Sequence, residues 1–484
     1  MIGPARTAAY HALRAIAAGH TDLPSALARS RTHLSDERDR ALAAEIVTGT
    51  LRWQRSLDHL VEHFANRRIA KVDPDVLHVL RLSLYQLLHL DRVPASAVVD
   101  AAVDLVRQAR KPSAAGFVNA VLRAALRQRH RLPLPSRPDT GGSTGSDAGG
   151  GSNTDDGTDR AAALAYLGVT HSHPEWLVAR WFDRHGFDAT ERWVRFNNET
   201  PRLALRVNTL RAGRDEVAAA LGAAGVDTAP TQHAPDGLIV TAGNPLRAPV
   251  PGSVSGSSSG SLSGSFFVQD EASQLVSLVV AARPGERVLD LCASPGGKTV
   301  AMAADTRDTG LLVACDVRAR RVRLLRDTVK TSGAACVRVA HVASSGPLPF
   351  AQVFDRVLVD APCSGLGAIR RDPDIRWRRS EADLEGFARD QLALLERAAA
   401  VVRPGGTLVY ATCSSEPDEN EVVVDTFLSR HDAFTLVDLR GDASSRLTPL
   451  LDERGMMRTL PFAHELEAFF AAALVRRPSQ PDYA

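Results

Sequence analysis

From residue 283 onward, short apolar runs alternate regularly with segments of helical character. We expect helices near 318–331 and 381–402, separated by apolar runs that are typical of buried strands. The predicted strands cover 287–292, 311–316, 337–340, 354–360 and 407–413. Because strands that alternate with helices are joined by crossover connections, this order predicts a Rossmann-like α/β domain with a mostly parallel sheet. Sheets of this kind bind ligands beyond the carboxyl ends of their strands.

The first 131 residues follow a different pattern, because strand-like alternation is nearly missing and apolar residues recur at helical steps. Leu80, Leu84 and Leu88 fall on one helix face in this way. Asp73 and Pro74 are the residue types that cap and begin a helix. We therefore expect an all-helical N-terminal domain.

This N-terminal domain is basic, although the whole chain has a formal net charge of only +2. Residues 1–131 contain 20 lysines and arginines against 12 aspartates and glutamates, a net charge of +8. The remainder contains 38 basic and 44 acidic residues, a net charge of −6. A basic domain fits a polyanionic partner such as RNA. An arginine-rich helical surface that contacts only solvent is the open alternative.

Two low-complexity tracts divide the chain into a multidomain protein. Residues 132–159 are rich in Gly, Ser, Thr and Asp, and we expect a flexible linker because such a segment buries too little apolar surface to offset its ordering entropy. Residues 160–265 are predicted to form a small α/β region, with a strand at 203–207 and a Gly/Ser loop insertion at 249–265. Residues 266–478 are predicted to form the Rossmann-like domain.

The number of cysteines and the hydropathy pattern indicate the cellular compartment of the protein. The chain of 484 residues has five cysteines, an odd and low number that argues against a secreted disulfide scaffold. No run of about 18 apolar residues is present, so no membrane span is expected. The first residues have the pattern of an amphipathic helix rather than of a signal peptide. We therefore expect a cytoplasmic protein with reduced thiols.

A glycine-containing loop, Cys292-Ala-Ser-Pro-Gly-Gly-Lys298, follows the first predicted strand of the sheet. It is not a P-loop, because Cys292 stands where that motif needs glycine, and G-x-G-x-x-G is also missing. Gly296 and Gly297 allow a ligand to approach the backbone closely. A tight turn without a phosphate cradle suits S-adenosylmethionine, and Asp316 can accept hydrogen bonds from ribose hydroxyls. The open alternative is a simple turn, with Asp316 as a helix cap.

Cys363 and Cys413 each follow a predicted strand, so the sheet can bring them to one edge. No CxxC pair or nearby histidine pair accompanies them, and no metal site is expected. A disulfide is possible if the thiols lie close, although a reducing cytoplasm disfavours it. The chemistry that needs cysteine here is methylation of pyrimidine carbon 5, because a thiolate added to carbon 6 makes carbon 5 nucleophilic. Asp360 is the candidate acid near N3 of the base.

An arginine-rich segment follows Cys363. Residues 370–379 hold five arginines and one tryptophan. This composition suits phosphate contacts and base stacking. A solvated loop is the open alternative.

Several long motifs of this chain, in this order, resemble those of the RNA (cytosine-5) methyltransferases, and especially the bacterial 16S ribosomal RNA enzymes of the RsmB/Sun type. The motifs are Phe267–Ser273, Leu289–Thr299, Asp360–Gly367, Arg371–Trp377 and Tyr410–Ser414. At the front of the chain, Asp39–Arg52 and Phe117–Arg123 are similar to a NusB-type helical RNA-binding domain. The resemblance covers nearly the whole chain except the two low-complexity tracts.

The resemblance implies a role for each matching residue. Cys413 would be the nucleophile that attacks carbon 6, Cys363 would aid release of the product, and Asp360 would contact the base. Lys298 would point into the active site. The residues implied at the S-adenosylmethionine site are Cys292, Ala293, Ser294, Pro295, Gly296, Gly297, Lys298, Asp316 and Asp360. The implied substrate is 16S ribosomal RNA, and a monomer is expected because one chain carries both an RNA-docking module and a complete catalytic sheet.

One stretch departs from the pattern of this family. The family carries an acidic residue that meets the adenine after the third strand, whereas this chain has His341-Val-Ala-Ser-Ser-Gly-Pro347, with Ser344 in that place. A non-catalytic RNA-binding assembly factor is therefore an open alternative, although Cys363, Cys413 and Asp360 are all intact. The same chemistry on another RNA, such as transfer RNA, is a second alternative.

Overall fold

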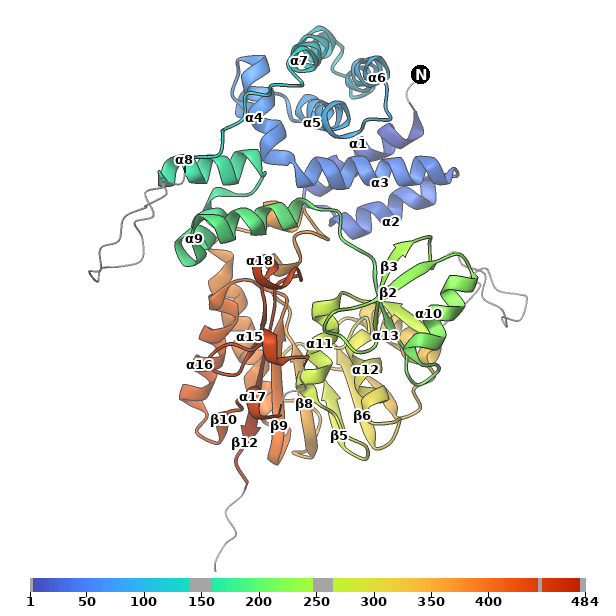
Figure 1. Ribbon diagram of the computed structural model, residues 1–484, viewed down its shortest axis with the longest axis vertical. Helices are drawn as coiled ribbons and strands as arrows, with labels where there is room; N and C mark the ends of the chain where they lie inside the picture. Colours follow the sequence, from blue (N-terminus) through green and yellow to red (C-terminus); the bar gives the residue numbers. More distant parts are fainter. Residues whose placement is uncertain (1–2, 140–158, 247–263, 443–445, 479–484) are drawn as a thin grey trace, which may run out of the picture. The chain divides into compact units, whose positions relative to one another are not determined.

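The computed structural model forms two compact units (Figure 1). The residues that the structure describes are 3–139, 159–246, 264–442 and 446–478. The first unit is Met1–Glu199 with Ile369–Glu381, and the second is Thr200–Ala368 with Ala382–Ala484. No helix within the described ranges combines the length and the apolar character that crossing a membrane requires.

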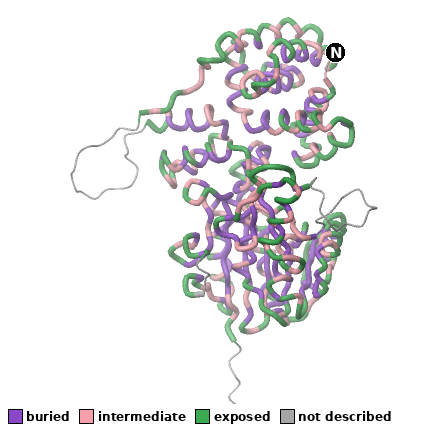
Figure 2. The backbone as a smooth tube through the Cα atoms, turned by 45° about the vertical axis from the view of Figure 1, so that its right-hand side comes forward, coloured by how far each residue is buried: buried purple, intermediate pink, exposed green. Residues whose placement is uncertain are grey.

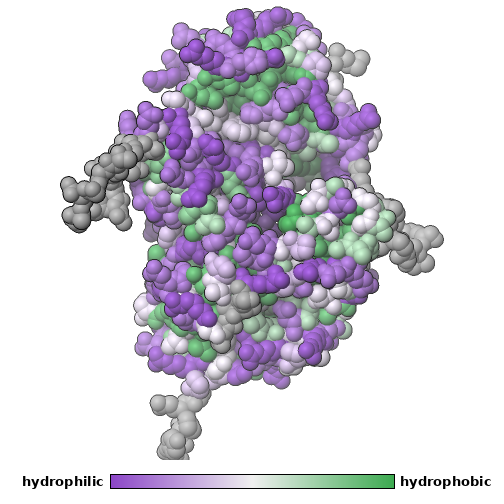
Figure 3. All heavy atoms as spheres, in the orientation of Figure 1, coloured by the Kyte–Doolittle hydropathy of each residue, from purple (hydrophilic) through white to green (hydrophobic). Residues whose placement is uncertain are grey.

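The first unit begins with helices, as the sequence predicts. They are α1 (Pro4–Ala17), α2 (Leu23–His33), α3 (Glu37–Arg52), α4 (Gln54–Ala65), α5 (Pro74–His89), α6 (Ala95–Gln108) and α7 (Ala115–Arg127). Asp73 caps α5, because its Oδ1 accepts the backbone N–H of Asp75, and Pro74 fills the first helical position. Leu80 and Leu84 are fully buried in the core that these helices share. On the face drawn in Figure 3, apolar side chains gather among α4, α5 and α7.

Three more helices belong to the first unit, so it extends well beyond residue 131. They are α8 (Arg160–Ala165), α9 (Glu175–Asn198) and α14 (Ile375–Arg378). Trp181 and Trp193 of α9 are fully buried and stack on each other with ring centroids 4.4 Å apart. These two rings can meet because α9 is kinked at Gly186, whose φ of +75° is a left-handed conformation that suits glycine.

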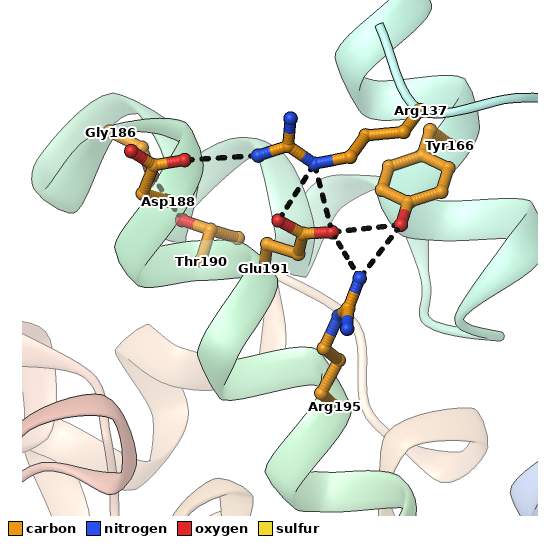
Figure 4. A network of polar contacts seen from close by, with 7 residues as sticks. All are labelled: Arg137, Tyr166, Gly186, Asp188, Thr190, Glu191 and Arg195. Carbon is orange, nitrogen blue, oxygen red and sulfur yellow. Dashed lines mark hydrogen bonds and ion pairs between the residues drawn. The ribbon is translucent and has the colours of Figure 1, made fainter.

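A carboxylate on α9, Glu191, holds the start of the expected linker against the first unit (Figure 4). Arg137 Nε lies 3.1 Å from Glu191 Oε2, and Arg137 Nη2 lies 3.2 Å from Asp188 Oδ1. Glu191 Oε1 also accepts hydrogen bonds from Tyr166 and Arg195, at 2.8 Å and 2.6 Å. The start of that linker, residues 132–139, is therefore held in place by the ion pairs of Arg137. Residues 140–158 lie outside the described residues.

The arginine-rich segment follows the Cys363 loop in sequence, but residues 369–381 pack within the first unit. Arg376 is completely buried, and its Nη1 donates a hydrogen bond to the Ser172 carbonyl at 2.8 Å. Trp377 Nε1 donates to the Leu51 carbonyl at 2.6 Å. A buried guanidinium needs such acceptors. These two side chains, which the composition of the segment assigns to RNA, are therefore used to hold the segment in place.

The second unit begins with a small α/β region, in agreement with the sequence. Its strands are β1 (Ala204–Val207), β2 (Asp227–Pro230), β3 (Gly237–Ala242) and β4 (Phe266–Val268), and its helix is α10 (Arg214–Ala223). The strands form an antiparallel sheet in the order β2-β3-β1-β4. Of the expected insertion at 249–265, only residues 264 and 265 lie within the described part of the chain.

The second sheet has the mostly parallel arrangement that the sequence predicts. Its strands are β5 (Arg287–Asp290), β6 (Leu311–Asp316), β7 (Val337–His341), β8 (Phe354–Asp360), β9 (Val402–Thr412), β10 (Phe434–Leu436), β11 (Met457–Thr459) and β12 (Phe469–Arg476). The order is β10-β12-β9-β8-β5-β6-β7, and β11 also pairs with β12. The five strands from β9 to β7 are parallel, and β12 runs antiparallel to its neighbours.

Helices cover both faces of this sheet. They are α11 (Glu271–Val280), α12 (Gly297–Asp305), α13 (Ala319–Ser332), α15 (Asp383–Ala399), α16 (Glu421–Arg430), α17 (Leu439–Asp442) and α18 (Pro461–His464). One hydrophobic cluster joins α11 and α12 to the strands, and another joins α15 and α16 to them. Burial is therefore concentrated along the strands (Figure 2). A sheet that is covered on both faces leaves the ends of its strands as the place for a ligand.

Candidate active site

The loops that carry the predicted site residues follow β5, β6, β8 and β9, which are neighbouring parallel strands. Their carboxyl ends therefore lie along one edge of the sheet. In the register of β8 and β9, Asp360 pairs with Ala411, so the loops after these two strands leave the sheet side by side. This arrangement brings together residues that are far apart in the sequence.

Cys363 and Cys413 meet at this edge. Cys363 lies in the loop after β8, and Cys413 directly follows β9. Their Sγ atoms are 3.3 Å apart, and both thiols are free. A disulfide bond would require about 2.05 Å, so the two sulfur atoms form a hydrogen-bond contact rather than a covalent bond. Both residues are partly exposed, which a reacting thiol needs.

The two thiols differ in their surroundings. The hydrogen bond to Cys413 raises the pKa of Cys363 well above its usual range, and burial and the negative charges of Cys413 and Glu419 raise it further. Cys363 therefore keeps its proton near neutral pH, and its sulfur is in hydrogen-bond contact with the sulfur of Cys413.

The other three cysteines also have pKa values raised by burial. Burial, with charges of nearby aspartates, raises the pKa of Cys292 far above its usual range. Burial also raises the pKa of Cys315 to about 12 and that of Cys336 to about 11. These thiols stay protonated at neutral pH, so they are inert by comparison.

Lys298 and Asp360 form an ion pair next to the thiols. Lys298 Nζ lies 2.8 Å from Asp360 Oδ2 and donates to Ser273 Oγ at 2.9 Å. Burial by itself would lower the pKa of Lys298, but the charge and hydrogen bond of Asp360 and the charges of Cys413 and Asp290 together raise it. Lys298 is therefore an ammonium at neutral pH.

The loop between β5 and α12 is packed closely against its neighbours in the second unit. The Ala293 N–H donates to the Cys315 carbonyl at 2.9 Å, which holds the loop against β6. Gly296 has a φ of +110°, and a Cβ atom there would lie 3.0 Å from Leu325. A Cβ atom on Gly297 would lie 3.1 Å from the Gln269 side chain. Both glycines are therefore needed for close packing and for this turn.

The residues around this loop fit S-adenosylmethionine. Two side-chain oxygens, Asp290 Oδ1 and Gln269 Oε1, are buried and have no hydrogen-bond partner within the described part of the chain. Buried acceptors without partners are costly and rare. The amino group and the ribose hydroxyls of S-adenosylmethionine are donors that can satisfy them. Asp316, which ends β6 and is 4% exposed, adds a further carboxylate at the same edge.

Asp290 gives the stability of the protein a specific pH dependence. Burial raises its pKa to about 7, although a hydrogen bond from Thr299 opposes this effect. The folded protein therefore holds a proton that the unfolded chain loses near pH 4, so the free energy of unfolding falls between about pH 4 and pH 7 and then levels off. A pKa difference of about three corresponds to a loss of about 4 kcal/mol.

Replacing Asp290 with asparagine is expected to remove this decrease, because the amide does not titrate. The test compares the melting temperatures of the wild-type protein and Asp290→Asn, both without cofactor, from pH 5 to pH 8. Asp305→Asn is a matched control. Burial raises the pKa of Asp305 to about 6, so the decrease in the free energy of unfolding that Asp305 causes ends at a lower pH than the decrease caused by Asp290. The assignment would be wrong if the melting temperatures of the wild type and of Asp290→Asn changed with pH in the same way.

The loop after β7, where the family pattern has an acidic residue, is fixed through its backbone. Ser344 is exposed, and its carbonyl accepts a hydrogen bond from Arg397 Nη1 at 3.1 Å. Arg397 also donates to the carbonyls of Ala343 and Gly346, at 3.0 Å and 2.7 Å. The chain therefore offers the cofactor edge an ordered backbone here rather than a carboxylate.

Two further residues of the site were not predicted from the sequence. Ser273 accepts the hydrogen bond from Lys298, and Arg206 of β1 donates to the Gly297 carbonyl at 3.1 Å. Arg206 is 3% exposed, so its side chain crosses from the small antiparallel sheet to the glycine loop inside the second unit. The only sequence signal for Ser273 is its place in the motif Phe267–Ser273. Arg206 has no sequence signal, because it lies within an ordinary strand.

Models of protein families match three parts of the chain. Residues 277–475 match the family described as 16S rRNA methyltransferase RsmB/F. Residues 4–127 match the NusB family, and residues 173–247 match the ferredoxin-like domain of RsmF/B-like methyltransferases. The helical first unit and the two sheets of the second unit thus have counterparts in known families.

Whole proteins with the same organisation are also similar to this chain. Ribosomal RNA small subunit methyltransferase B of Pseudomonas putida is 33% identical over 91% of this chain and 92% of its own length. The protein of the same name from Shigella sonnei is 31% identical over 91% of both chains. The crystal structure of PH0851 covers 98% of this chain and 99% of its own, with a TM-score of 0.73 and 28% identity.

Proposed function

Because the chain belongs to the RsmB/F family of 16S rRNA methyltransferases, we propose that it methylates carbon 5 of a cytosine in 16S ribosomal RNA, with Cys413 as the nucleophile. Methylation of rRNA with S-adenosylmethionine is the activity of this family, so the non-catalytic assembly factor is set aside. The observation that carries the proposal is the approach of Cys363 and Cys413 to 3.3 Å beside Lys298 and Asp360.

The first chemical step is the addition of Cys413 to carbon 6 of the base. A new Sγ–C6 bond forms, and the electron pair of the C5–C6 double bond moves toward carbon 5 and the ring nitrogen N3. Lys298 carries the proton of the Lys298–Asp360 pair, so it supplies the hydrogen bond that stabilises charge on the ring. Asp360, which the sequence predicts as the acid near N3, would instead accept from the exocyclic amino group as the ion-pair partner of Lys298.

Bound S-adenosylmethionine supplies the methyl group that carbon 5 receives. The proton on carbon 5 is then lost to solvent, and its bonding electrons restore the C5–C6 double bond as the Sγ–C6 bond breaks. Cys413 leaves as a thiolate, so the net change is replacement of one hydrogen by one methyl group. Cys363, in contact with Cys413, aids this release.

For the cofactor, the loop Cys292–Gly297 offers its backbone to the amino-acid part and Asp316 offers its carboxylate to the ribose. The buried side-chain oxygens Asp290 Oδ1 and Gln269 Oε1 would accept hydrogen bonds from further donor groups of the cofactor. Lys298, which follows this loop, and Asp360, which ends β8, would face both the cofactor and the base. We also propose that residues 1–131, with a net charge of +8, dock the RNA and that the protein works as a monomer.

The identity of the substrate is tested by bisulfite sequencing of 16S ribosomal RNA from cells with and without the gene. We expect one protected cytosine in the 16S RNA that becomes fully convertible when the gene is deleted and is protected again when it is restored. A change confined to transfer RNA, with the 16S pattern unaltered, would replace the proposed substrate by the alternative one.

A further inference from the structure

One buried carboxylate, Glu419, contacts the residues that follow both cysteines of the site. Glu419 lies just before helix α16, and its side chain is completely buried. Its Oε2 accepts hydrogen bonds from the hydroxyls of Ser364 and Ser414, each at 2.5 Å. Ser364 directly follows Cys363, and Ser414 directly follows Cys413. A single oxygen atom therefore joins the two cysteine loops.

The second carboxylate oxygen of Glu419 holds the first of these loops more tightly. Its Oε1 accepts the Ser364 backbone N–H at 2.8 Å and Gln391 Nε2 at 2.9 Å. Gln391, on α15, also donates to the Pro362 carbonyl at 3.1 Å, one residue before Cys363. The carboxyl group thus accepts four hydrogen bonds and donates none, which is the pattern of an ionised carboxylate.

The segment that carries Glu419 is itself fixed against the second loop. Asn420 Nδ2 donates to the Ser414 carbonyl at 3.1 Å, and Thr412 Oγ1 donates to Asn420 Oδ1 at 2.5 Å. The Tyr410 hydroxyl donates to the Glu419 carbonyl at 2.6 Å. Residues on both sides of Cys413 are therefore held by the same turn, which makes it a rigid reference point for both sulfur atoms.

The carboxylate of Glu419 accepts its hydrogen bonds from neutral donors, which belong to Ser364, Ser414 and Gln391. In a buried setting such a charge acts strongly on nearby groups. It raises the pKa of Cys363, in addition to the larger effects of the Cys413 hydrogen bond and of burial. Glu419 thus affects the two thiols both through geometry and through charge.

We propose that Glu419 is a positioning residue for methyl transfer, which holds the Cys363 and Cys413 loops together through Ser364 and Ser414. Its negative charge also contributes to the raised pKa of Cys363. Cys413 is then the sulfur that is free to attack. This inference rests on the proposed function and adds to it the group that makes the two thiols unequal. Glu419 acts through Ser364 and Ser414, since these are the residues that its side chain binds.

The test uses the full-length protein and two changes at this position. Glu419→Gln keeps the shape and removes the charge, whereas Glu419→Ala removes the hydrogen bonds as well. Glu271→Gln is the matched control, because Glu271 is also a buried carboxylate of the second unit that accepts backbone N–H groups, those of His233 and Ala234. Iodoacetamide alkylation of Cys363 and Cys413 is followed by mass spectrometry without RNA, from neutral pH up to the highest pH at which the protein stays folded. The values of kcat and KM for RNA methylation are measured alongside.

We expect Glu419→Gln to shift the alkylation profile of Cys363 to lower pH and to lower kcat about tenfold, with KM unchanged, because charge-assisted hydrogen bonds become neutral ones. Glu419→Ala should lower kcat about a hundredfold, the effect of a misplacement of roughly 1 Å. Glu271→Gln should leave the alkylation profile as in the wild type.

The proposal is overturned if the Cys363 profile of Glu419→Gln coincides with that of the wild type, or if its loss of kcat is no larger than that of Glu271→Gln. If Glu419→Ala does not fold, Glu419→Gln alone decides the question. Failure of the proposed function is a separate outcome, because the wild-type protein would then transfer no methyl group to RNA, while the alkylation profiles would still report on the two thiols.

Discussion

Replacing Cys413 with alanine is expected to abolish methyl transfer to RNA, with a loss of about a thousandfold or more in the rate of a single turnover. Without a nucleophile at carbon 6, carbon 5 of cytosine keeps its low reactivity, and positioning by the rest of the site cannot compensate. The measurement is the transfer of a labelled methyl group from S-adenosylmethionine to 16S ribosomal RNA, with enzyme in excess over RNA.

The control for this variant is Cys336→Ala. Cys336 is a buried cysteine of the same unit, and burial raises its pKa to about 11, so it makes no contribution to the reaction. We expect it to retain the activity of the wild type after a small loss of melting temperature. A Cys413→Ala protein that still methylates RNA at a rate within tenfold of the wild type would show that another group attacks the base.

Replacing Cys363 with alanine is expected to have the opposite signature, namely a covalent complex that accumulates. Cys413 is still present and adds to carbon 6, but the thiol that lies 3.3 Å from its sulfur in the structure, and that is proposed to aid release, is lost. Steady-state turnover should therefore fall by about a hundredfold or more. The trapped protein–RNA complex is detected as a slowly migrating band on a denaturing gel with labelled RNA and S-adenosylmethionine.

The double variant Cys363→Ala with Cys413→Ala identifies the bond that is trapped. It should give no slowly migrating band, because the sulfur that forms the bond is missing. A band of equal intensity in the double variant would show that Cys413 does not form the trapped bond. No band in the single Cys363 variant would show that Cys363 is not needed for release. The assays are run with a reducing agent, because two thiols this close can be oxidised to a disulfide.

Much of the second sheet could be predicted from the sequence, because each of its elements has a local signature. The strand predicted over 354–360 is β8, with the same bounds, and the strand over 311–316 is β6. The structure starts strand β9 at Val402, but its regular pairing with β8 and with β12 begins at Thr407, where the sequence predicts the strand to start. The Pro404-Gly-Gly turn signal lies in between, where Gly405 has a φ of +74° and the register with β8 shifts.

The arginine-rich segment shows where composition misleads. Five arginines within ten residues are typical of an exposed, RNA-binding surface. Arg376 is nevertheless fully buried, because carbonyl acceptors from Ser172 and Asn197 surround its guanidinium within the first unit. Those acceptors lie 204 and 179 residues earlier in the chain. No local pattern can indicate such partners.

The sequence by itself determined the class of the sheet, the edge at which the motifs lie and the chemistry that two cysteines beside a cofactor loop can perform. These features depend on residue type and spacing, which act over a few residues and are therefore legible along the chain. Only the tertiary structure decided that the two sulfur atoms are 3.3 Å apart, that Lys298 is the charged partner of Asp360, and that Glu419 joins both cysteine loops. Each of these contacts joins segments between 5 and 62 positions apart, and the side chains meet only because packing of parallel strands places their loops side by side.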